Sequence, residues 1–254
     1  MIEVVPVDDR DDPRIADYVD LRDGRESDVV IVEGPTALEQ LVGSPYPLRS
    51  VLCLAKRLDR VRGLLQGGVV YVAPEPVLRA TVGFDLHRGI VAAADRAPEI
   101  SRTSVLATAR RIAIIERLND HENLGALFRN ARGLGVDALL LDPETADPLY
   151  RRAVRVSMGH VLRAPFARIE PWPAALREVT AAGFTVVALT PRGEVTIDDV
   201  DPPDKVAFLL GAEGPGLSDG ALAAADVRAR IDMANGVDSL NVATAAAIAF
   251  HVVR

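Results

Sequence analysis

The stretch KVAFLLGAEGPGLS, residues 205–218, passes from a continuous apolar segment directly into a turn that contains three glycines. Its apolar part has no alternating polar positions, which is typical of a parallel strand buried on both faces. The segment FTVVALT, residues 184–190, has the same character. Such strands predict a doubly wound α/β sheet, whose ligands bind beyond the carboxyl ends of the strands. Gly211, Gly214 and Gly216 therefore follow a strand where a ligand is expected, and they allow the backbone to approach it closely.

Strand-like and helix-like stretches alternate around these two segments, which predicts one α/β domain over residues 104–254. Further strands are predicted at 111–118, 136–142 and 227–233, and helices at 123–135, 147–159, 172–183 and from 242 to the end of the chain.

The first part of the chain shows a βαβ rhythm of its own, which predicts a separate small α/β domain over residues 1–97. Its strands are expected at 28–34, 48–55, 69–73 and 88–94, and its helices at 35–42, 57–66 and 74–82. Residues 95–104 interrupt the apolar pattern with charge, Pro and Ser, and are expected to form the linker.

The net charge of −7 is concentrated at one end of the chain, since residues 1–28 hold ten acids and four arginines. We expect this acidic segment to be a flexible leader. The first residues contain acids where a signal peptide needs basic ones. No apolar run approaches the ~18 residues that cross a bilayer. The sequence therefore predicts a soluble, cytoplasmic protein.

A metal centre is not expected. Cys53 is the only cysteine and lies among apolar residues, where a strand core is predicted. The four histidines are widely separated and show no metal-ligand spacing.

A basic stretch without acids covers residues 150–168 and contains Arg151, Arg152, Arg155, Arg163 and Arg168. A solvated helix face would usually intersperse acids with its arginines. A local stripe of this kind attracts phosphate even on an acidic protein. It therefore predicts contact with a nucleic acid.

Three polar clusters fall at or beside the predicted strand ends. In NLGALFRNA, Arg129 has apolar neighbours, so burying it requires an anionic partner, and a structural salt bridge is the alternative. In LLGAEGPGLS, Glu213 within a glycine turn suits a cationic ligand better than a pyrophosphate. In DSLN, Ser239 and Asn241 precede an alanine-rich helix, and helix capping alone is the alternative.

Taken together, the three clusters resemble the SpoU/TrmH branch of the SPOUT-class RNA ribose 2′-O-methyltransferases. The motifs that carry the resemblance are NLGALFRNARGLGVDALLL, ADPLYRRAVRVSMG, LLGAEGPGLS and IDM…DSLNVATAAAIAFH, in the family's order. One departure is mild, because VATAAA replaces a serine-containing continuation. The first domain is similar to a ribosomal-protein-like RNA-binding domain often attached to this family.

The resemblance implies a C-terminal trefoil knot that binds S-adenosylmethionine, and a homodimer whose active sites lie at the subunit interface. The cofactor-binding residues that it implies are Leu189, Thr190, Gly211, Ala212, Gly216, Ile231, Met233 and Leu240. The catalytic residues that it implies are Arg129, Asn123, Glu213, Ser239 and Asn241. Contacts with the substrate RNA are expected from Arg129, Arg151, Arg152, Arg155 and Ser157.

The expected function is methyl transfer from S-adenosylmethionine to a ribose 2′-hydroxyl, with ribosomal RNA preferred over transfer RNA as substrate. A non-catalytic RNA-binding or ribosome-assembly protein of the same fold is the main alternative. A nicotinamide-dependent dehydrogenase is disfavoured, because neither domain has the glycine fingerprint after its first strand.

Overall fold

The computed structural model describes residues 1–21, 28–201 and 203–253, and it divides into two compact units. Unit 1 comprises Met1–Pro98 and Leu149–Arg163, and unit 2 comprises Glu99–Pro148 and Ala164–Arg254. Residues 149–163, which the sequence places within the second domain, therefore pack with the first. Within the described ranges, no helix has both the length and the apolar character needed to cross a bilayer.

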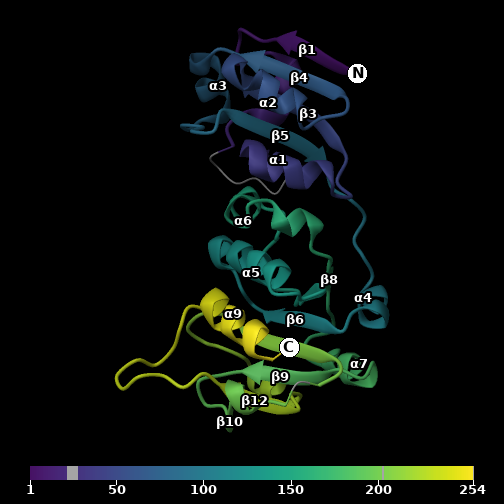
Figure 1. Ribbon diagram of the computed structural model, residues 1–254, viewed down its shortest axis with the longest axis vertical. Coiled ribbons are helices and arrows are strands. Elements are labelled where there is room, and N and C mark those ends of the chain that lie inside the picture. Colours follow the sequence, from purple (N-terminus) through teal and green to yellow (C-terminus); the bar gives the residue numbers. More distant parts are fainter. Residues whose placement is uncertain (22–27, 202, 254) are drawn as a thin grey trace. The chain divides into compact units, whose positions relative to one another are not determined.

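Unit 2 is built on a parallel sheet, as the sequence predicts (Figure 1). Its elements are α4 (Arg102–Thr108), β6 (Arg111–Glu116), α5 (His121–Gly133), β7 (Ala138–Leu141), β8 (Phe166–Arg168), α7 (Leu176–Ala181), β9 (Thr185–Leu189), β10 (Val195–Thr196), η4 (Ile197–Asp199), β11 (Val206–Gly211), α8 (Asp219–Ala223), β12 (Val227–Arg230) and α9 (Val242–Val252). The strand order is β10-β12-β9-β11-β6-β7-β8, and each pairing between neighbours is parallel.

Both faces of this sheet are covered, which explains why its central strands are mostly apolar. On one face, Leu209 of β11 belongs to a buried cluster with Leu176 of α7. On the other face, the Phe208 ring meets Phe250 of α9 with a centroid separation of 5.0 Å. Because successive side chains of a strand point to opposite faces, a strand between two helical layers needs apolar residues at every position.

Arg111 at the start of β6 holds the ends of α5 and α9 together. Its Nη2 donates to the carbonyls of Phe250 and Val253 at 2.6 and 2.9 Å, and its Nη1 donates to Leu134 at 2.7 Å. A guanidinium in this position satisfies the carbonyls that a helix leaves unpaired at its carboxyl end. The arrangement places α5 beside α9.

The predicted linker is partly helical. Helix α4 begins at Arg102, and Ser101 caps it by accepting a hydrogen bond from the Ser104 amide at 3.1 Å. Val105 and Leu106 of this helix join the core of unit 2.

Unit 1 contains a mixed sheet of order β1-β4-β3-β5-β2, in which β5 is antiparallel to both of its neighbours. Its elements are β1 (Ile2–Pro6), η1 (Pro13–Tyr18), β2 (Val29–Glu33), α1 (Gly34–Val42), β3 (Leu48–Leu54), η2 (Ala55–Arg57), α2 (Leu58–Arg62), β4 (Gly68–Ala73), α3 (Glu75–Val82), β5 (Ile90–Asp95), α6 (Arg151–Val156) and η3 (His160–Arg163). Cys53 is buried in β3, and this burial raises the pKa of its thiol to about 11.

The acidic N-terminal segment is folded over its described residues, in contrast to the flexible leader that the sequence predicts for residues 1–28. Strand β1 pairs in parallel with β4 at the edge of the sheet. Ile15 and Tyr18 of η1 are fully buried, and the Tyr18 hydroxyl lies 2.7 Å from the Ser50 hydroxyl. The two buried side chains hold the segment on unit 1. Residues 22–27 of the predicted leader lie outside the described residues.

The segment 149–163 packs on unit 1 through specific contacts. Arg151 forms an ion pair with Glu33, and both side chains are largely buried. Arg163 donates to the Gln40 carbonyl at 3.0 Å, near the end of α1. Gly159 lies so close to α1 that a Cβ there would stand 2.9 Å from the Cα of Ala37. These contacts explain why the segment groups with unit 1.

Candidate active site

A pocket of about 1120 Å³ lies in unit 2 at the carboxyl ends of β9, β11 and β12. This is the edge of the sheet where the sequence predicts a ligand. All eight predicted cofactor-binding residues line it, namely Leu189, Thr190, Gly211, Ala212, Gly216, Ile231, Met233 and Leu240. Of the predicted catalytic residues, Glu213, Ser239 and Asn241 also line the pocket.

The glycine turn, residues 211–217, forms one wall of the pocket and folds back on itself. The Gly216 amide donates to the Ala212 carbonyl at 3.0 Å. A Cβ on Gly211 would stand 2.5 Å from both the Gly216 carbonyl carbon and the Leu217 nitrogen, so no larger residue fits there. Gly214 and Gly216 adopt φ values of +84° and +68°, which favour glycine. Glycine is therefore required for steric reasons at position 211, and the backbone conformation favours it at positions 214 and 216.

Three of the predicted catalytic side chains meet in one hydrogen-bonded cluster. The Asn123 amide donates to Oε1 of Glu213 at 2.9 Å. The Asn241 amide donates to Oδ1 of Asn123 at 2.6 Å and to the same Glu213 oxygen at 3.0 Å. These residues come from α5, the glycine turn and the start of α9, so the cluster joins three distant parts of the sequence.

Helix geometry explains how α5 reaches this cluster. Asn123 and Asn130 are seven residues apart, about two turns, and therefore share a face of α5. Asn130 donates to the Ala243 carbonyl at 2.8 Å, while Asn123 meets Asn241, so this face lies along the beginning of α9. The Asp120 side chain caps α5 by accepting a hydrogen bond from the main-chain N–H of Asn123 at 2.7 Å, and this bond positions the first turn of the helix.

Arg129 and Ser239 stand apart from the cluster. Arg129 is exposed, and it makes no hydrogen bond or ion pair with any residue that the structure describes. Six residues along a helix correspond to about 9 Å and a rotation of about 120° from Asn123, which accounts for the separation. Ser239 is also exposed, on the pocket wall. The salt bridge considered for Arg129 is not present among the described residues.

Asn241 both caps α9 and joins the cluster, so two substitutions separate these roles. Its Oδ1 accepts from the Ala243 and Thr244 amides at 3.0 and 3.2 Å. Asn241→Asp keeps this acceptor, but it loses both donations and places a carboxylate beside Glu213. We expect Asn241→Asp to lose most of the activity that the resemblance implies, whereas Asn241→Ala also loses about 1 kcal/mol of folding stability.

An assay of the implied activity and chemical denaturation measure the two effects. Ser101→Ala is the matched control, because it removes the side-chain cap of α4 outside the pocket. We expect it to lose a similar amount of stability and to retain activity. Full activity in Asn241→Asp would refute a role for the cluster.

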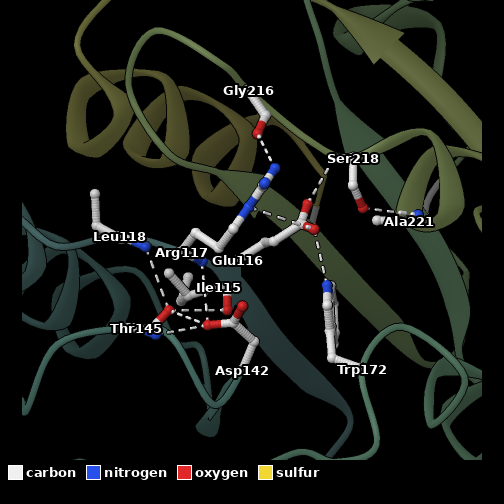
Figure 2. Close-up of polar contacts among 10 residues, drawn as sticks. All are labelled: Ile115, Glu116, Arg117, Leu118, Asp142, Thr145, Trp172, Gly216, Ser218 and Ala221. Carbon is white, nitrogen blue, oxygen red and sulfur yellow. Dashed lines mark hydrogen bonds and ion pairs between the residues drawn. The ribbon is translucent and has the colours of Figure 1, made fainter.

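Residues that the sequence does not single out lie beneath the glycine turn (Figure 2). Glu116, at the end of β6, is 1% exposed and accepts hydrogen bonds from Trp172 and from the Ser218 main chain. Asp142 is equally buried and accepts from Thr145 and from the Arg117 main chain. The available signal for Glu116 was an acid ending the apolar run IAIIE, which resembles an ordinary strand end.

The predicted RNA-contacting residues of the basic stretch have different environments. Arg151 pairs with Glu33 and lies over the Phe84 ring, 4.6 Å from its centroid. Ser157 is fully buried, and its hydroxyl donates to the Val154 carbonyl at 2.9 Å. Because these two side chains are engaged within unit 1, neither is presented to a ligand. Arg152 and Arg155 are exposed.

Within the described part of the chain, no three His, Cys, Asp or Glu side chains are grouped so that they could hold a metal ion.

Comparison with known families shows which family the region that contains this site belongs to. Residues 110–251 match the model of the SpoU rRNA methylase family. The matched region covers more than half of the chain and contains the whole cluster and the whole pocket. The chain belongs to the SpoU rRNA methylase family. It is an RNA methyltransferase, and S-adenosylmethionine is its methyl donor.

Relatives of this SpoU-family chain extend over nearly its full length. An uncharacterized tRNA/rRNA methyltransferase of Mycobacterium tuberculosis is 45% identical, covering 98% of this chain and 91% of the relative. The 23S rRNA (guanosine(2553)-2′-O)-methyltransferase RlmP of Bacillus subtilis is 26% identical, covering 95% and 96%. The crystal structure of the AdoMet-bound rRNA methyltransferase from Sinorhizobium meliloti superposes with a TM-score of 0.84 at 26% identity, covering 99% and 97%.

The lining of the pocket suits the methyl donor of the SpoU family. Both apolar side chains and main-chain groups line the pocket. The Leu240 side chain is 38% exposed, so apolar surface is available there for contact with a base. Carboxylates also line the pocket and suit a sulfonium cation: Glu213, Asp219, Asp232 and Asp238. Since small-molecule pockets are mostly ~300–1,000 Å³ in volume, the space suffices for a molecule of this size.

Proposed function

We propose that this protein transfers the methyl group of S-adenosylmethionine to a ribose 2′-hydroxyl of ribosomal RNA. The observation that carries the proposal is the cluster of Asn123, Glu213 and Asn241 at the edge of a pocket suited to the donor. The similarity to RlmP extends through both units, which supports ribosomal RNA as the substrate. We also place the protein in the cytoplasm, where such RNA is made and modified.

The eight pocket residues predicted from the resemblance are proposed to hold the donor, which supplies an electrophilic methyl group on sulfur. We further propose that the C-terminal segment passes through a loop as a trefoil knot. In support, the glycine turn and residues 237–242 line one pocket, and α9 returns to lie along α5. The apolar side chains of the pocket would pack against the base of the donor, and main-chain groups of the glycine turn would form hydrogen bonds with the donor.

Within this proposal, the cluster of Asn123, Glu213 and Asn241 positions the ribose hydroxyl. Holding two reacting groups in the correct geometry contributes ~7 kcal/mol or more to the lowering of a barrier. Asn123 and Asn241 provide short, directional amides, and Ser239 adds an exposed hydroxyl at the pocket wall. The thioether leaving group is neutral, so the protein needs no leaving-group acid. The proton of the attacking hydroxyl is proposed to pass to solvent water at the exposed wall of the pocket, beside Ser239.

Arg129 is proposed to act in a homodimer, at the pocket of the partner subunit. It is exposed and does not line the pocket of its own protomer, which supports this assignment. A guanidinium holds its proton firmly in neutral solution, so it is a poor base there. We therefore assign it to binding the RNA phosphate and to stabilising negative charge that develops on the 2′-oxygen.

Unit 1 is proposed to bind the RNA, and two of its arginines are well placed for this. Arg57 and Arg88 are exposed, without an ion pair among the described residues. They lie at the same end of the sheet, where β3 ends and β5 begins, because the Leu54 amide donates to the Gly89 carbonyl at 3.0 Å. The exposed Arg152 and Arg155 are proposed to contribute further phosphate contacts.

Charge reversal tests this surface. The double variant Arg57→Glu/Arg88→Glu is expected to weaken RNA binding and to reduce the slope of log affinity against log salt by about 2, since each phosphate contact contributes roughly 0.7–0.9. Binding of S-adenosylmethionine should not change. The control is Arg14→Glu/Arg79→Glu, which alters the same number of charges in arginines already paired with Asp12 and Asp85. Equal salt slopes in the two double variants would exclude the proposed surface.

The proposed function is tested by mapping ribose methylation across total RNA from cells with and without the gene. We expect one or a few 2′-O-methyl sites in ribosomal RNA to disappear and to return on complementation. Loss of a site in transfer RNA instead would correct the substrate, and an unchanged map would contradict the proposal.

A further inference from the structure

The buried carboxylate of Glu116 connects three separate segments next to the glycine turn (Figure 2). Its Oε1 accepts a hydrogen bond from the Trp172 indole at 2.8 Å. Its Oε2 accepts from the Ser218 main-chain amide, also at 2.8 Å. Ser218 directly follows the glycine turn and caps α8. A charge at this depth requires such partners, because an unpaired buried carboxylate is strongly unfavourable.

Arg117, the residue that follows β6, reaches the same turn beside Glu116. Its Nη2 donates to the Gly216 carbonyl at 3.4 Å, and its Nε lies 3.8 Å from Oε1 of Glu116. Arg117 has a φ of +55°, which a side chain of this size rarely adopts. The Asp142 carboxylate accepts from the Arg117 amide at 3.1 Å and holds the backbone in this conformation.

The end of β6 therefore contacts the glycine turn at three successive points. Main-chain pairing places Glu116 opposite Gly211, at the beginning of the turn. Arg117 holds the Gly216 carbonyl, and the Glu116 carboxylate holds the Ser218 amide. Between these points the turn carries Glu213, which joins the polar cluster. Any displacement of the turn thus moves both the pocket wall and a member of the cluster.

We propose that Glu116 is a positioning residue that sets the conformation of the glycine turn for the methyl donor, with Trp172 as its second attachment. The inference rests on the proposed location of the donor in this pocket. In Glu116→Gln only one side-chain oxygen can accept a hydrogen bond, and the NH2 group that replaces the other oxygen cannot accept from Ser218 or from Trp172. The volume of the side chain is retained while the link between these two segments is broken.

The experiment compares Glu116→Gln with Asp137→Asn. Asp137 accepts from the Arg110 and Arg111 amides at 2.8 and 2.9 Å, so it makes the same kind of contact at the opposite end of β6. Hydrogen exchange in the donor-free protein should become faster over residues 212–218 in Glu116→Gln only. Calorimetry should show about tenfold weaker binding of S-adenosylmethionine in this variant, as expected for one unsatisfied buried hydrogen bond.

The kinetic readout is a rise in the KM for S-adenosylmethionine that exceeds the change in kcat, with Asp137→Asn close to wild type. If Glu116→Gln does not fold, Trp172→Phe removes the indole N–H donor together with part of the ring system, and a weaker effect of the same kind is expected. Unchanged donor affinity and exchange in the folded variant would overturn the inference. Failure of the wild-type protein to bind the donor would instead refute the proposed function.

Discussion

Replacing Arg129 with alanine is expected to lower kcat for methyl transfer by about 10²–10³-fold, as for the removal of other groups that stabilise developing charge. The affinity for S-adenosylmethionine should not change, because Arg129 does not line the pocket of its own protomer. Folding stability should also be unaffected, since the side chain is exposed and makes no hydrogen bond or ion pair with the described residues. Single-turnover methyl transfer and calorimetry measure the two properties separately.

Arg132→Ala is the matched control, because Arg132 is an exposed arginine one turn further along α5. It should retain wild-type activity. Methyl transfer at the normal rate by Arg129→Ala would remove this residue from the mechanism.

Mixing two impaired variants tests whether Arg129 acts across a dimer. At a donor concentration too low to occupy Gly211→Ala subunits, combining them with Arg129→Ala subunits should restore about a quarter of the wild-type activity, because half of the randomly formed dimers contain one complete site. If both groups must belong to one subunit, the mixture stays inactive.

The second large effect is expected for Gly211→Ala. Its Cβ would stand 2.5 Å from two main-chain atoms of the glycine turn, and neither atom can move without displacing the pocket wall. Forcing an extra methyl group into such a contact costs about 1–3 kcal/mol, which corresponds to roughly a 10- to 100-fold loss of donor affinity when the turn gives way. Calorimetric titration with S-adenosylmethionine measures this loss.

Gly133→Ala serves as the control for this substitution. Gly133 ends α5, has no positive φ, and a Cβ there would meet nothing within 4 Å. We expect unchanged donor affinity and unchanged or slightly higher stability. Equal donor affinities in the two alanine variants would contradict the steric role of Gly211.

The sequence predicted those parts of the fold in which local pattern and burial agree. The runs that became β9 and β11 are almost entirely apolar because helices cover both faces of their sheet. Strand β1 was missed, because IEVVP lies at the edge of a sheet beside many acids, where few positions are buried. Its pairing with β4 depends on residues more than sixty positions away, which no local pattern reveals.

The same distinction applies to the site. Asn123, Glu213 and Asn241 were identified through the family motifs, and the structure brings them together. Arg151 was assigned to RNA because the sequence cannot show that its partner is Glu33, 118 residues away. Glu116 was missed for the same reason, since its contacts with Trp172 and Ser218 exist only in the folded chain.

A crystal structure of the protein with S-adenosylmethionine tests the central claim most directly. We predict that the donor lies in the pocket between Leu189, the glycine turn and Leu240, and that its methyl group faces the Asn123–Glu213–Asn241 cluster. We also predict Arg129 of the partner subunit beside that methyl group. A donor bound elsewhere, or a methyl group directed away from the cluster, would contradict this account.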